Sequence, residues 1–480
     1  MHKRTLGIRS QHVAAGSMFV FFGCLLSLTL LVWFAPSPQQ FFRQENAPEL
    51  LIPVNPNDLY HDSIHLSRLN AVCVEAKDAI IPHSYNSSKF DKNSVWHQDL
   101  DSDALYQLLA LCPQVDVFLP KGLRNHGYCE DAMAYVKFLH ARALPYWVLE
   151  LSWERNGIFW KGEKITYLDL CPETAILYLS NYWDGVDQLS HFPNEKTIIL
   201  MPNIERYELL PEHFYRADIV LAKTLDAYNR IVSWYEQAGN PRNTKVIYTQ
   251  HTTSNPTLET KSFSRNFENL SIFHANGNSN RKSTESILAC WASRPDFPRI
   301  DIFSQDASSK FLFDELFPDK KLIPSNLNYH YGEVLSAKEF GKRLQEASVI
   351  LCPSSQEGFG HYINQARASG ALVATTDGAP MNEFISRESG VLVKSQYEEY
   401  WFQTPDQLMG KQFWFWQPNR RMQFYVSSSS ICNAMDEIIA MSPTKRAELA
   451  HRSYLAYYSQ MAFFKEAMRT LRQTLMSLKS

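Results

Sequence analysis

Short runs of consecutive apolar residues recur along most of the chain, separated by segments whose apolar residues are spaced three or four apart. In the first half these runs are VDVFLP (115–120), YWVLEL (146–151), TIILMP (197–202), DIVLA (218–222) and KVIYT (245–249). In the second half they are LSIFHA (270–275), RIDIF (299–303), SVILCP (348–353), ALVATT (371–376) and GVLV (390–393). Apolar strands alternating with amphipathic helices are typical of parallel sheets covered on both faces. The pattern predicts an α/β fold with two doubly wound, Rossmann-like sheets facing a cleft.

Two helix starts are marked by their capping residues. Ser336 and Glu339 form a capping box that opens a helix over 336–346, and Phe340, Leu344 and Ala347 share one face before the strand at Ser348. Ser442 precedes Pro443, which predicts an N-cap with proline at the first helical position. A final helical region is therefore expected over 441–480.

A run of 23 residues without a charged side chain occupies residues 13–35. At about 1.5 Å per residue, such a helix can cross a hydrocarbon core of roughly 30 Å. Basic residues precede the run at Lys3, Arg4 and Arg9, which favours a cytoplasmic N-terminus. The alternative is a cleaved signal peptide, although the run is longer than a typical apolar signal region. We expect a cytoplasmic tail (1–12), a transmembrane signal anchor (13–35) and a lumenal body, as in a single-pass type II protein of the Golgi or ER membrane.

The remainder divides into a stem and two domains. Residues 36–65 contain repeated prolines without a sustained periodicity, which indicates a stem. The two groups of strands then predict a first Rossmann-like domain over 66–255 and a second over 256–440.

The composition argues against nucleic-acid binding and does not determine which cysteines are oxidised. The formal net charge is −3, so the chain lacks the broad basic field of a nucleic-acid-binding protein. Seven cysteines follow the apolar run, and none has the spacing of a metal-ligand motif, which favours one or two disulfides plus buried thiols. Sequons at Asn86 and Asn269 are expected glycosylation sites of a lumenal body.

The most informative stretch is CPSSQEGFGHYINQARASGALVATTDGAPMNEFI (352–385). A strand ends at Pro353, a serine- and glycine-rich loop follows, and a helix begins near Gly360. Backbone N–H groups at such a helix start suit a phosphate group, and Glu357 could accept hydrogen bonds from sugar hydroxyls. An ordinary turn between strand and helix, with Glu357 favouring the helix dipole, explains the same residues.

This stretch resembles the donor-binding segment of GT-B glycosyltransferases of the retaining, family-four type, which use nucleotide sugars. The similarity rests on the proline–serine pair, the Glu-Gly-Phe-Gly sequence and the small-residue helix end, and extends to FHANGNSNRKSTESILACW (273–291). The resemblance covers about 125 residues of the second domain. It implies a GT-B enzyme that transfers a sugar from a nucleotide-sugar donor to a hydroxyl of a glycan, glycoprotein or lipid, without metal or other cofactor.

The resemblance also assigns roles to individual residues. Glu357 would hold the transferred sugar, and Lys282, beside Arg281, would neutralise the diphosphate leaving group. The donor would further contact the segment from Gly358 through Phe359 and Gly360 to His361.

Two positions depart from the family pattern. Gln365 replaces the second family glutamate, which holds the nucleotide ribose, and Asn276 replaces a phosphate-binding arginine. These departures motivate an alternative function, a catalytically inactive relative that binds a glycan or a protein partner.

Candidates on the acceptor side follow strands of the first domain. Asn203 and Glu205 follow the strand at 197–202, Lys223 follows that at 218–222, and His251 follows that at 245–249. Carboxyl ends of parallel strands are where such sheets bind ligands, and Glu205 is the preferred catalytic candidate. Helix capping is the alternative role for each strand-end residue.

Two further segments have structural explanations. The run from Asp99 to Asp103 contains a DxD sequence, the metal motif of a different glycosyltransferase fold, but it precedes a helical segment and is best explained as an N-cap. Residues 397–425 hold ten aromatic side chains, which predicts an internally packed satellite core, or else a sugar-stacking or membrane-facing surface.

Overall fold

The computed structural model describes residues 54–125, 127–154, 164–205, 209–258, 265–397 and 423–477. The expected cytoplasmic tail, the apolar run 13–35 and most of the stem lie outside the described residues, as does most of the aromatic segment 397–425. Within the described ranges, no helix is both long enough and apolar enough to cross a membrane.

The first sheet has seven strands in the order β1-β3-β2-β6-β7-β8-β9. The strands are β1 (Ile81–Pro82), β2 (Val115–Phe118), β3 (Arg142–Leu144), β6 (Ala175–Leu179), β7 (Ile198–Met201), β8 (Ile219–Ala222) and β9 (Lys245–Tyr248). All neighbours pair in parallel except β1 and β3. The helices of this half are α3 (Tyr60–Glu75), α4 (Ser102–Leu109), α5 (Tyr128–Leu139), α6 (Trp147–Glu150), α7 (Tyr167–Leu170), α8 (Pro211–Arg216) and α9 (Leu225–Ala238). A small hairpin joins β4 (Ser152–Glu154) to β5 (Lys164–Thr166).

The second sheet has six parallel strands in the order β12-β11-β10-β13-β14-β15. They are β10 (Ile272–Gly277), β11 (Ile300–Ser304), β12 (Leu327–Tyr331), β13 (Val349–Cys352), β14 (Leu372–Thr376) and β15 (Val391–Val393). The helices are α10 (Thr284–Ser293), α11 (Ala307–Leu316), α12 (Ala337–Glu346), α13 (His361–Ala368), α14 (Met381–Phe384) and α15 (Ser428–Ala440). A two-stranded sheet pairs β16 (Gln396–Tyr397) with β17 (Phe424–Tyr425). The prediction of an α/β fold with parallel sheets is confirmed.

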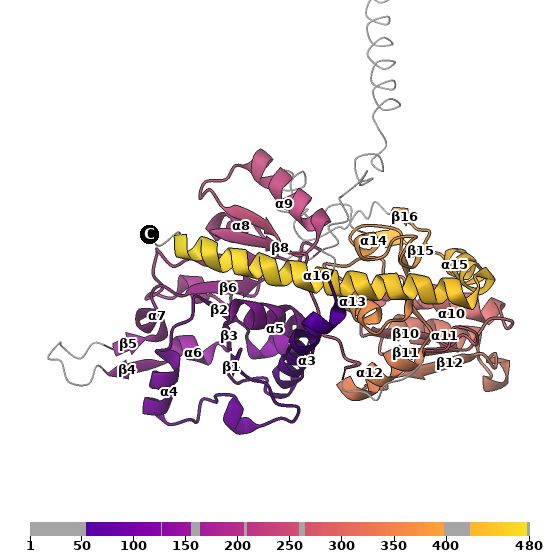
Figure 1. Cartoon of the computed structure of the whole chain (residues 1–480), viewed down its shortest axis with the longest axis horizontal. Helices are drawn as coiled ribbons and strands as arrows, with labels where there is room; N and C mark the ends of the chain where they lie inside the picture. Colours follow the sequence, from indigo (N-terminus) through magenta and orange to yellow (C-terminus); the bar gives the residue numbers. More distant parts are fainter. Residues whose placement is uncertain are drawn as a thin grey trace, which may run out of the picture. The chain divides into compact units, whose positions relative to one another are not determined.

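The C-terminal helix α16 (Pro443–Ser477), yellow in Figure 1, packs against elements of both halves. It contacts α5 of the first half and both α13 and β14 of the second. Tyr457, Phe464 and Met468 are buried in the same core cluster as α5, all of whose side chains are buried. Because α5 lies in this core, any polar side chain on it must have partners inside the protein.

Both predicted helix starts are present. The Ser336 hydroxyl accepts from the Glu339 N–H, and the Glu339 carboxylate accepts from the Ser336 N–H, which completes the capping box of α12. The Ser442 hydroxyl accepts from the Lys445 N–H at 3.2 Å, at the start of α16.

Several sequence expectations differ from the structure. The run 146–151, predicted as a strand, contains the helical turn α6, because its three consecutive buried apolar residues (147–149) have no period that separates a helix from a strand. Helix α3 begins at Tyr60, inside the expected stem, and buries Leu66 and Leu69. Strands β3, β6 and β12 are not among the predicted strands. Strands β3 and β12 are short or mixed in polarity, whereas β6 has the continuous apolar sequence AILYL and could have been predicted.

The described residues contain three disulfides rather than the expected one or two. They join Cys73 to Cys129, Cys112 to Cys171 and Cys290 to Cys432, and Cys352 is a buried free thiol. The partners are 56, 59 and 142 positions apart, so only the fold determines the pairing.

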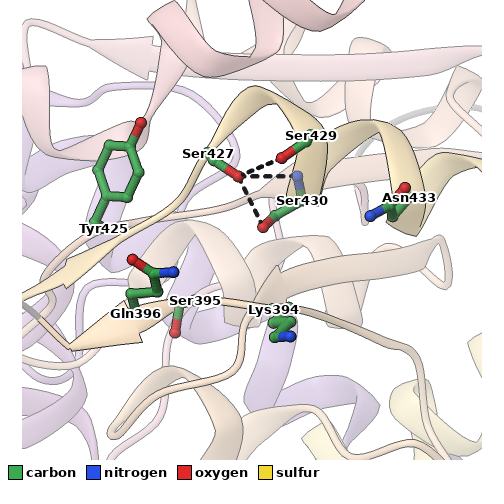
Figure 2. A pocket seen from close by; sticks show the side chains of 8 residues that line it. All are labelled: Lys394, Ser395, Gln396, Tyr425, Ser427, Ser429, Ser430 and Asn433. Atoms are coloured by element: carbon green, nitrogen blue, oxygen red, sulfur yellow. Dashed lines mark hydrogen bonds between the residues drawn. The ribbon is translucent and has the colours of Figure 1, made fainter.

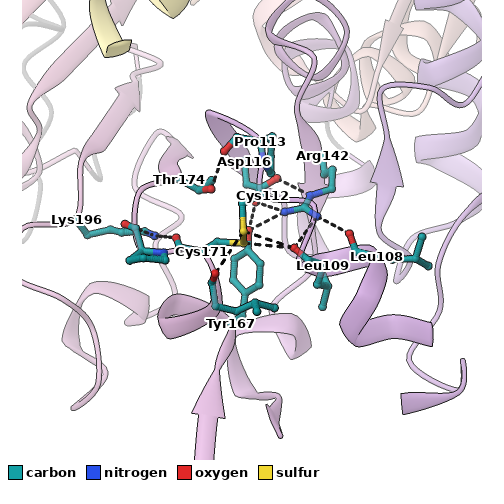
Figure 3. A network of polar contacts seen from close by, with 12 residues as sticks. Leu108, Leu109, Cys112, Pro113, Asp116, Arg142, Tyr167, Cys171, Thr174 and Lys196 are labelled. Carbon is teal, nitrogen blue, oxygen red and sulfur yellow. Dashed lines mark hydrogen bonds and ion pairs between the residues drawn. A yellow bond between two sulfur atoms is a disulfide. The ribbon is translucent and has the colours of Figure 1, made fainter. Parts of the chain in front are cut away.

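A buried polar network stabilises the amino-terminal part of the first sheet (Figure 3). Asp116 of β2 accepts two hydrogen bonds from Arg142 of β3, each 3.0 Å long, and a third from the Tyr167 hydroxyl. The disulfide between Cys112 and Cys171 lies in the same region. Since ligands of parallel sheets bind at the opposite, carboxyl ends of the strands, we assign this network a structural role.

Candidate functional site

The loop between β13 and α13 brings together two residues that the sequence singled out separately. Glu357 accepts a hydrogen bond from the Lys282 ammonium group and another, 2.6 Å long, from the Ser354 hydroxyl. Both side chains are mostly buried, with 16% of Lys282 and 12% of Glu357 exposed. A carboxylate and an ammonium are thus held next to the amino end of α13.

Two glycines give this loop its shape. Gly360 is the N-cap of α13 and has φ of 87°, a left-handed conformation that favours glycine. At Gly358, a Cβ atom would lie 2.1 Å from Oε2 of Glu205, so only glycine allows the two segments to approach this closely. The donor-side loop of the second half therefore contacts Glu205, the preferred candidate from the first half.

Glu205 lies in an environment that favours its protonated form. Burial raises the pKa of its carboxyl group, and the nearby carboxylates of Glu357 and Asp131 add to this effect, while Lys223 opposes it. A carboxyl group with a raised pKa at the carboxyl end of β7 is suited to exchange a proton with an acceptor hydroxyl.

Asp131, on α5, is the centre of a second charged group. Its carboxylate lies 3.0 Å from the Lys223 ammonium, 3.0 Å from Nε2 of His361 and 3.2 Å from Nε2 of His251. Burial alone would raise the pKa of Asp131, but Lys223 and His361 together hold it well below its usual value. Burial lowers the pKa of His251 to about 4, so this ring is neutral near pH 7.

Three of these residues have the composition of a metal site. The ligand atoms of Asp131, His251 and His361 all lie within 4.8 Å of one another. However, the Lys223 ammonium already neutralises the Asp131 carboxylate, and a divalent cation there would face this positive charge at short range. The geometry thus favours an ion pair between Asp131 and Lys223 over a bound metal.

Glu130, the neighbour of Asp131, connects the two halves directly. It accepts hydrogen bonds from Asn70 on α3, from Thr253 and Ser254 in the segment after β9, and from the Gln365 amide on α13 at 2.9 Å. Because every partner is a donor, the residue is suited to be an ionised carboxylate.

Several buried polar atoms without a partner among the described residues lie at the carboxyl ends of strands, and others are scattered over helices and loops. Those at the strand ends include Oδ1 of Asn203 and Oε2 of Glu205 after β7, Oε1 of Gln250 after β9, and both amide atoms of Asn276 at the end of β10. Unpaired buried polar groups are costly, so native proteins place few of them away from sites where a ligand or water can bind. The atoms at the strand ends agree with the rule that parallel sheets bind ligands at this edge.

The structure thus places most of the sequence candidates at one location. Glu205, Lys282 and Glu357 lie around the loop at Gly358, and Phe359 is buried with its ring 4.9 Å from that of His251. The main-chain oxygen of Arg281 accepts a hydrogen bond from the Ser355 N–H. His361 and Gln365 face the first half, where they contact Asp131 and Glu130.

Glu130 and Asp131 are not among the site residues predicted from the sequence. The available signal was a pair of adjacent acidic residues within the otherwise largely apolar segment YCEDAMAYVKFL. Acidic residues in a buried helix are rare unless they are paired, so this pattern can indicate a site.

Other candidates lie elsewhere. The Asp101 carboxylate accepts hydrogen bonds from the N–H groups of Asp103 and Ala104, which confirms an N-cap at the DxD sequence. The sequon residues Asn86 and Asn269 are exposed, as glycosylation would require.

A pocket of about 210 Å³ lies between β16, β17 and the start of α15 (Figure 2). Lys394, Gln396, Tyr425 and several serines are among its lining residues. None of the predicted site residues lines this pocket.

Comparison with known proteins gives a remote likeness. No family model and no curated protein matches the chain. Sucrose-phosphate synthase from Thermosynechococcus elongatus is similar over 63% of this chain and 73% of its own, with 14% identity and a TM-score of 0.44. Anabaena HepE in complex with UDP and glucose is similar over 63% of this chain and 78% of its own, with 15% identity and a TM-score of 0.42. Trehalose-6-phosphate synthase OtsA is similar over 63% of this chain and 72% of its own, with 10% identity and a TM-score of 0.45. At these values, an assignment of function has to rest on the residues of the site.

Proposed function

We propose that this protein is a GT-B glycosyltransferase that transfers a sugar from a nucleoside diphosphate sugar to a hydroxyl group, with retention at the anomeric carbon. The observation that carries the proposal is the contact between Lys282 and Glu357 beside the amino end of α13, with Glu205 packed against Gly358. These are the three residues that the motif resemblance and the strand-end rule selected independently.

The arrangement supports a simple division of roles. When the donor binds, Glu357 would turn from Lys282 to hydroxyl groups of the sugar, and Lys282 would face the diphosphate. As the bond from the anomeric carbon to the diphosphate breaks, the leaving group gains negative charge, which Lys282 and the N–H groups at the start of α13 stabilise. The acceptor oxygen then bonds to the same face of the sugar, and its proton would pass to Glu205 in the ionised form of that carboxyl group.

The family resemblance suggests the kind of acceptor, and the apolar run 13–35 suggests the location of the protein in the cell. The acceptor would be a glycan, glycoprotein or lipid, and the run would hold the body in the lumen of the Golgi or ER as a single-pass type II protein. Exposed sequons at Asn86 and Asn269 are compatible with this location.

The second candidate function is an inactive relative that binds a glycan or a protein partner. It is favoured by Asn276, whose buried amide stands where relatives have a phosphate-binding arginine. The hydrogen bond from Gln365 to Glu130 weakens this alternative, because it gives the second departure a structural reason.

A binding and transfer screen tests the proposal. The full chain in detergent is heated with each of a panel of nucleoside diphosphates, and nucleoside diphosphate release from the matching sugars is then measured. We expect one nucleotide to raise Tm, since a ligand at about 100 Kd adds roughly 2.7 kcal/mol. Nucleotide binding without release of the diphosphate, with glycan acceptors present, would favour the inactive relative.

Metal dependence is a separate prediction. Because Lys282 and a helix terminus supply the positive charge, EDTA should leave both the transfer rate and Tm unchanged, as measured before and after dialysis. A rate restored only by Mg²⁺ or Mn²⁺ would show that a metal, rather than Lys282, neutralises the diphosphate.

A further inference from the structure

We propose that Glu130 is a positioning residue of the donor site, and that the amide of Gln365 serves Glu130 rather than the nucleotide. This inference rests on the proposed function for its kinetic consequences, but its structural part can be tested without any activity.

The contacts of Glu130 span three parts of the chain. On the first half, the carboxylate accepts from the Asn70 amide at 2.7 Å. In the segment between the halves, it accepts from the Ser254 N–H at 2.8 Å, the Ser254 hydroxyl at 2.6 Å and the Thr253 hydroxyl at 3.0 Å. On the second half, it accepts from Gln365 at 2.9 Å. A single side chain, 6% exposed, therefore fixes the connecting segment and α13 to α5.

The connecting segment is held on other sides as well. The Tyr457 hydroxyl of α16 donates to the Thr253 main-chain oxygen at 2.8 Å, and the Asn255 amide donates to that of Ala368, at the end of α13, at 3.1 Å. His361 bonds to the Thr253 hydroxyl at 3.0 Å. Helix α13, whose amino end we propose to face the diphosphate, is thus held along its length by Thr253 at His361, by Glu130 at Gln365 and by Asn255 at Ala368.

This geometry explains why an amide occupies position 365. An ionised Glu130 accepts hydrogen bonds but cannot donate one. A glutamate at position 365 would set two carboxylates side by side in a mostly buried location, and such a pair is destabilising unless one carboxylate takes up a proton. Glutamine removes the repulsion and supplies the donor. The departure from the family pattern is therefore coupled to Glu130 and is no sign of lost function.

The test is a cycle of four proteins: the full-length wild type, Gln365→Glu, Glu130→Gln and the double variant. The double variant exchanges the two groups, so an amide at position 130 can donate to a carboxylate at position 365. Asn70 can adapt, because its buried Oδ1 has no partner among the described residues and a turn of its amide would present that oxygen. Gln237→Glu, on the exposed side of α9, is the control for the change of charge, because the Ser233 hydroxyl that accepts from the Gln237 amide at 2.8 Å can donate to a carboxylate instead.

We expect Gln365→Glu to lower Tm and to lower kcat/KM by about tenfold or more, chiefly by raising KM for the donor. The double variant should recover most of both losses, and Gln237→Glu should change neither. The same cycle is measured by calorimetric titration with the nucleoside diphosphate that the screen selects, so donor-site affinity is read without catalysis.

Three results would overturn the inference. Additive losses in the double variant would show that the two residues are not coupled. If the Tm changes of the two substitutions are not additive but KM and nucleotide affinity stay unchanged, Glu130 has only a structural role. Tighter nucleotide binding by Gln365→Glu, with no loss of Tm, would show that position 365 faces the nucleotide. If the wild type transfers no sugar at all, the proposed function fails, while the Tm cycle still reports on Glu130.

Discussion

At the scale of single residues, the site depends on side chains far apart in sequence whose chemistry is complementary. Lys282 and Glu357 are 75 positions apart, yet the ammonium and carboxylate groups are in contact. Each is mostly buried, and leaving either one unpaired would have a cost in the absence of a ligand. We infer that the pair keeps both groups ordered until the donor provides new partners for each.

Removing either member should stop transfer and leave the fold nearly intact. Lys282→Met removes the charge that stabilises the leaving diphosphate, and Glu357→Gln weakens the hold on the sugar. We expect turnover to fall by about 10²–10³-fold for each, the loss typical of removing one group that stabilises developing charge. Steady-state kinetics and Tm are the measurements, with the exposed Lys338→Met as control. Wild-type turnover in either variant would contradict the placement of the donor.

The substitution Gly358→Ala tests whether transfer depends on the contact between the two halves. Gly358→Ala would place its Cβ 2.1 Å from the Glu205 carboxylate, so the loop or the carboxylate must move. Because displacements near 1 Å at a reacting centre can cost about 10²-fold in rate, we expect a loss of that order. Gly122→Ala is the matched control, since nothing lies within 4 Å of the added methyl group. Equal activity of the two variants would mean that Glu205 plays no part in transfer.

At the scale of elements, the amino end of helix α9 in the first half is bonded to a side chain of the second half. The first N–H groups of α9, at Leu225 and Asp226, each donate at 2.8 Å to the carboxylate of Glu383, which lies on α14 of the second half. Thr224 caps the same helix by accepting from the Ala227 N–H at 3.1 Å. The start of α9 is thus stabilised by its own N-cap and by the two carboxyl oxygens of Glu383, whose pKa burial raises to about 8.

Glu383→Ala should lower the stability of the protein. The variant leaves two N–H groups of α9 without their acceptor, and loss of a helix cap costs about 1 kcal/mol. Thermal or urea unfolding measures the difference. Glu236→Ala removes an exposed carboxylate from α9 itself and should change stability by less than about 0.5 kcal/mol. Equal effects of the two substitutions would show that the cap from α14 contributes nothing.

At the scale of the whole molecule, buried polar groups make stability depend on pH. His274, on β10, is fully buried, with Nδ1 at 2.8 Å from the Leu351 main-chain oxygen and Nε2 at 2.9 Å from the Thr284 hydroxyl. Burial lowers its pKa from 6.5 to about 4, although the hydrogen bond with Leu351 opposes the shift. The folded protein therefore keeps this ring neutral at pH values where the unfolded chain takes up a proton.

Stability should consequently decrease as pH falls from 6.5 towards 4. The unfolded chain binds the proton first, so acid favours unfolding. At pH 5, His274 should lower the free energy of unfolding by about 2 kcal/mol relative to neutral pH. Urea unfolding at pH 7 and pH 5 measures the loss, which should be smaller in His274→Gln because that side chain does not titrate. His451→Gln, at an exposed position of α16, should keep the wild-type pH dependence. An unchanged slope in His274→Gln would assign the acid sensitivity to other groups.

The sequence by itself determined the features that depend on local order. Apolar runs of strand length, the capping box at Ser336 and the N-cap before Pro443 each depend on residues within a few positions, so the α/β class and these helix starts could be predicted. The segment around Glu357 could be recognised for the same reason, because its motif is continuous in the chain.

Only the tertiary structure decided what depends on residues far apart in the sequence. The three disulfide pairings, the contact of Glu205 with Gly358 and the four segments that meet at Glu130 arise when separate elements pack together. The helical turn at 147–150 shows the same limit, since an apolar run has no period that separates a buried helix from a buried strand. The amide at position 365 shows it most clearly: its reason is a carboxylate 235 positions earlier in the chain, which packing places 2.9 Å away.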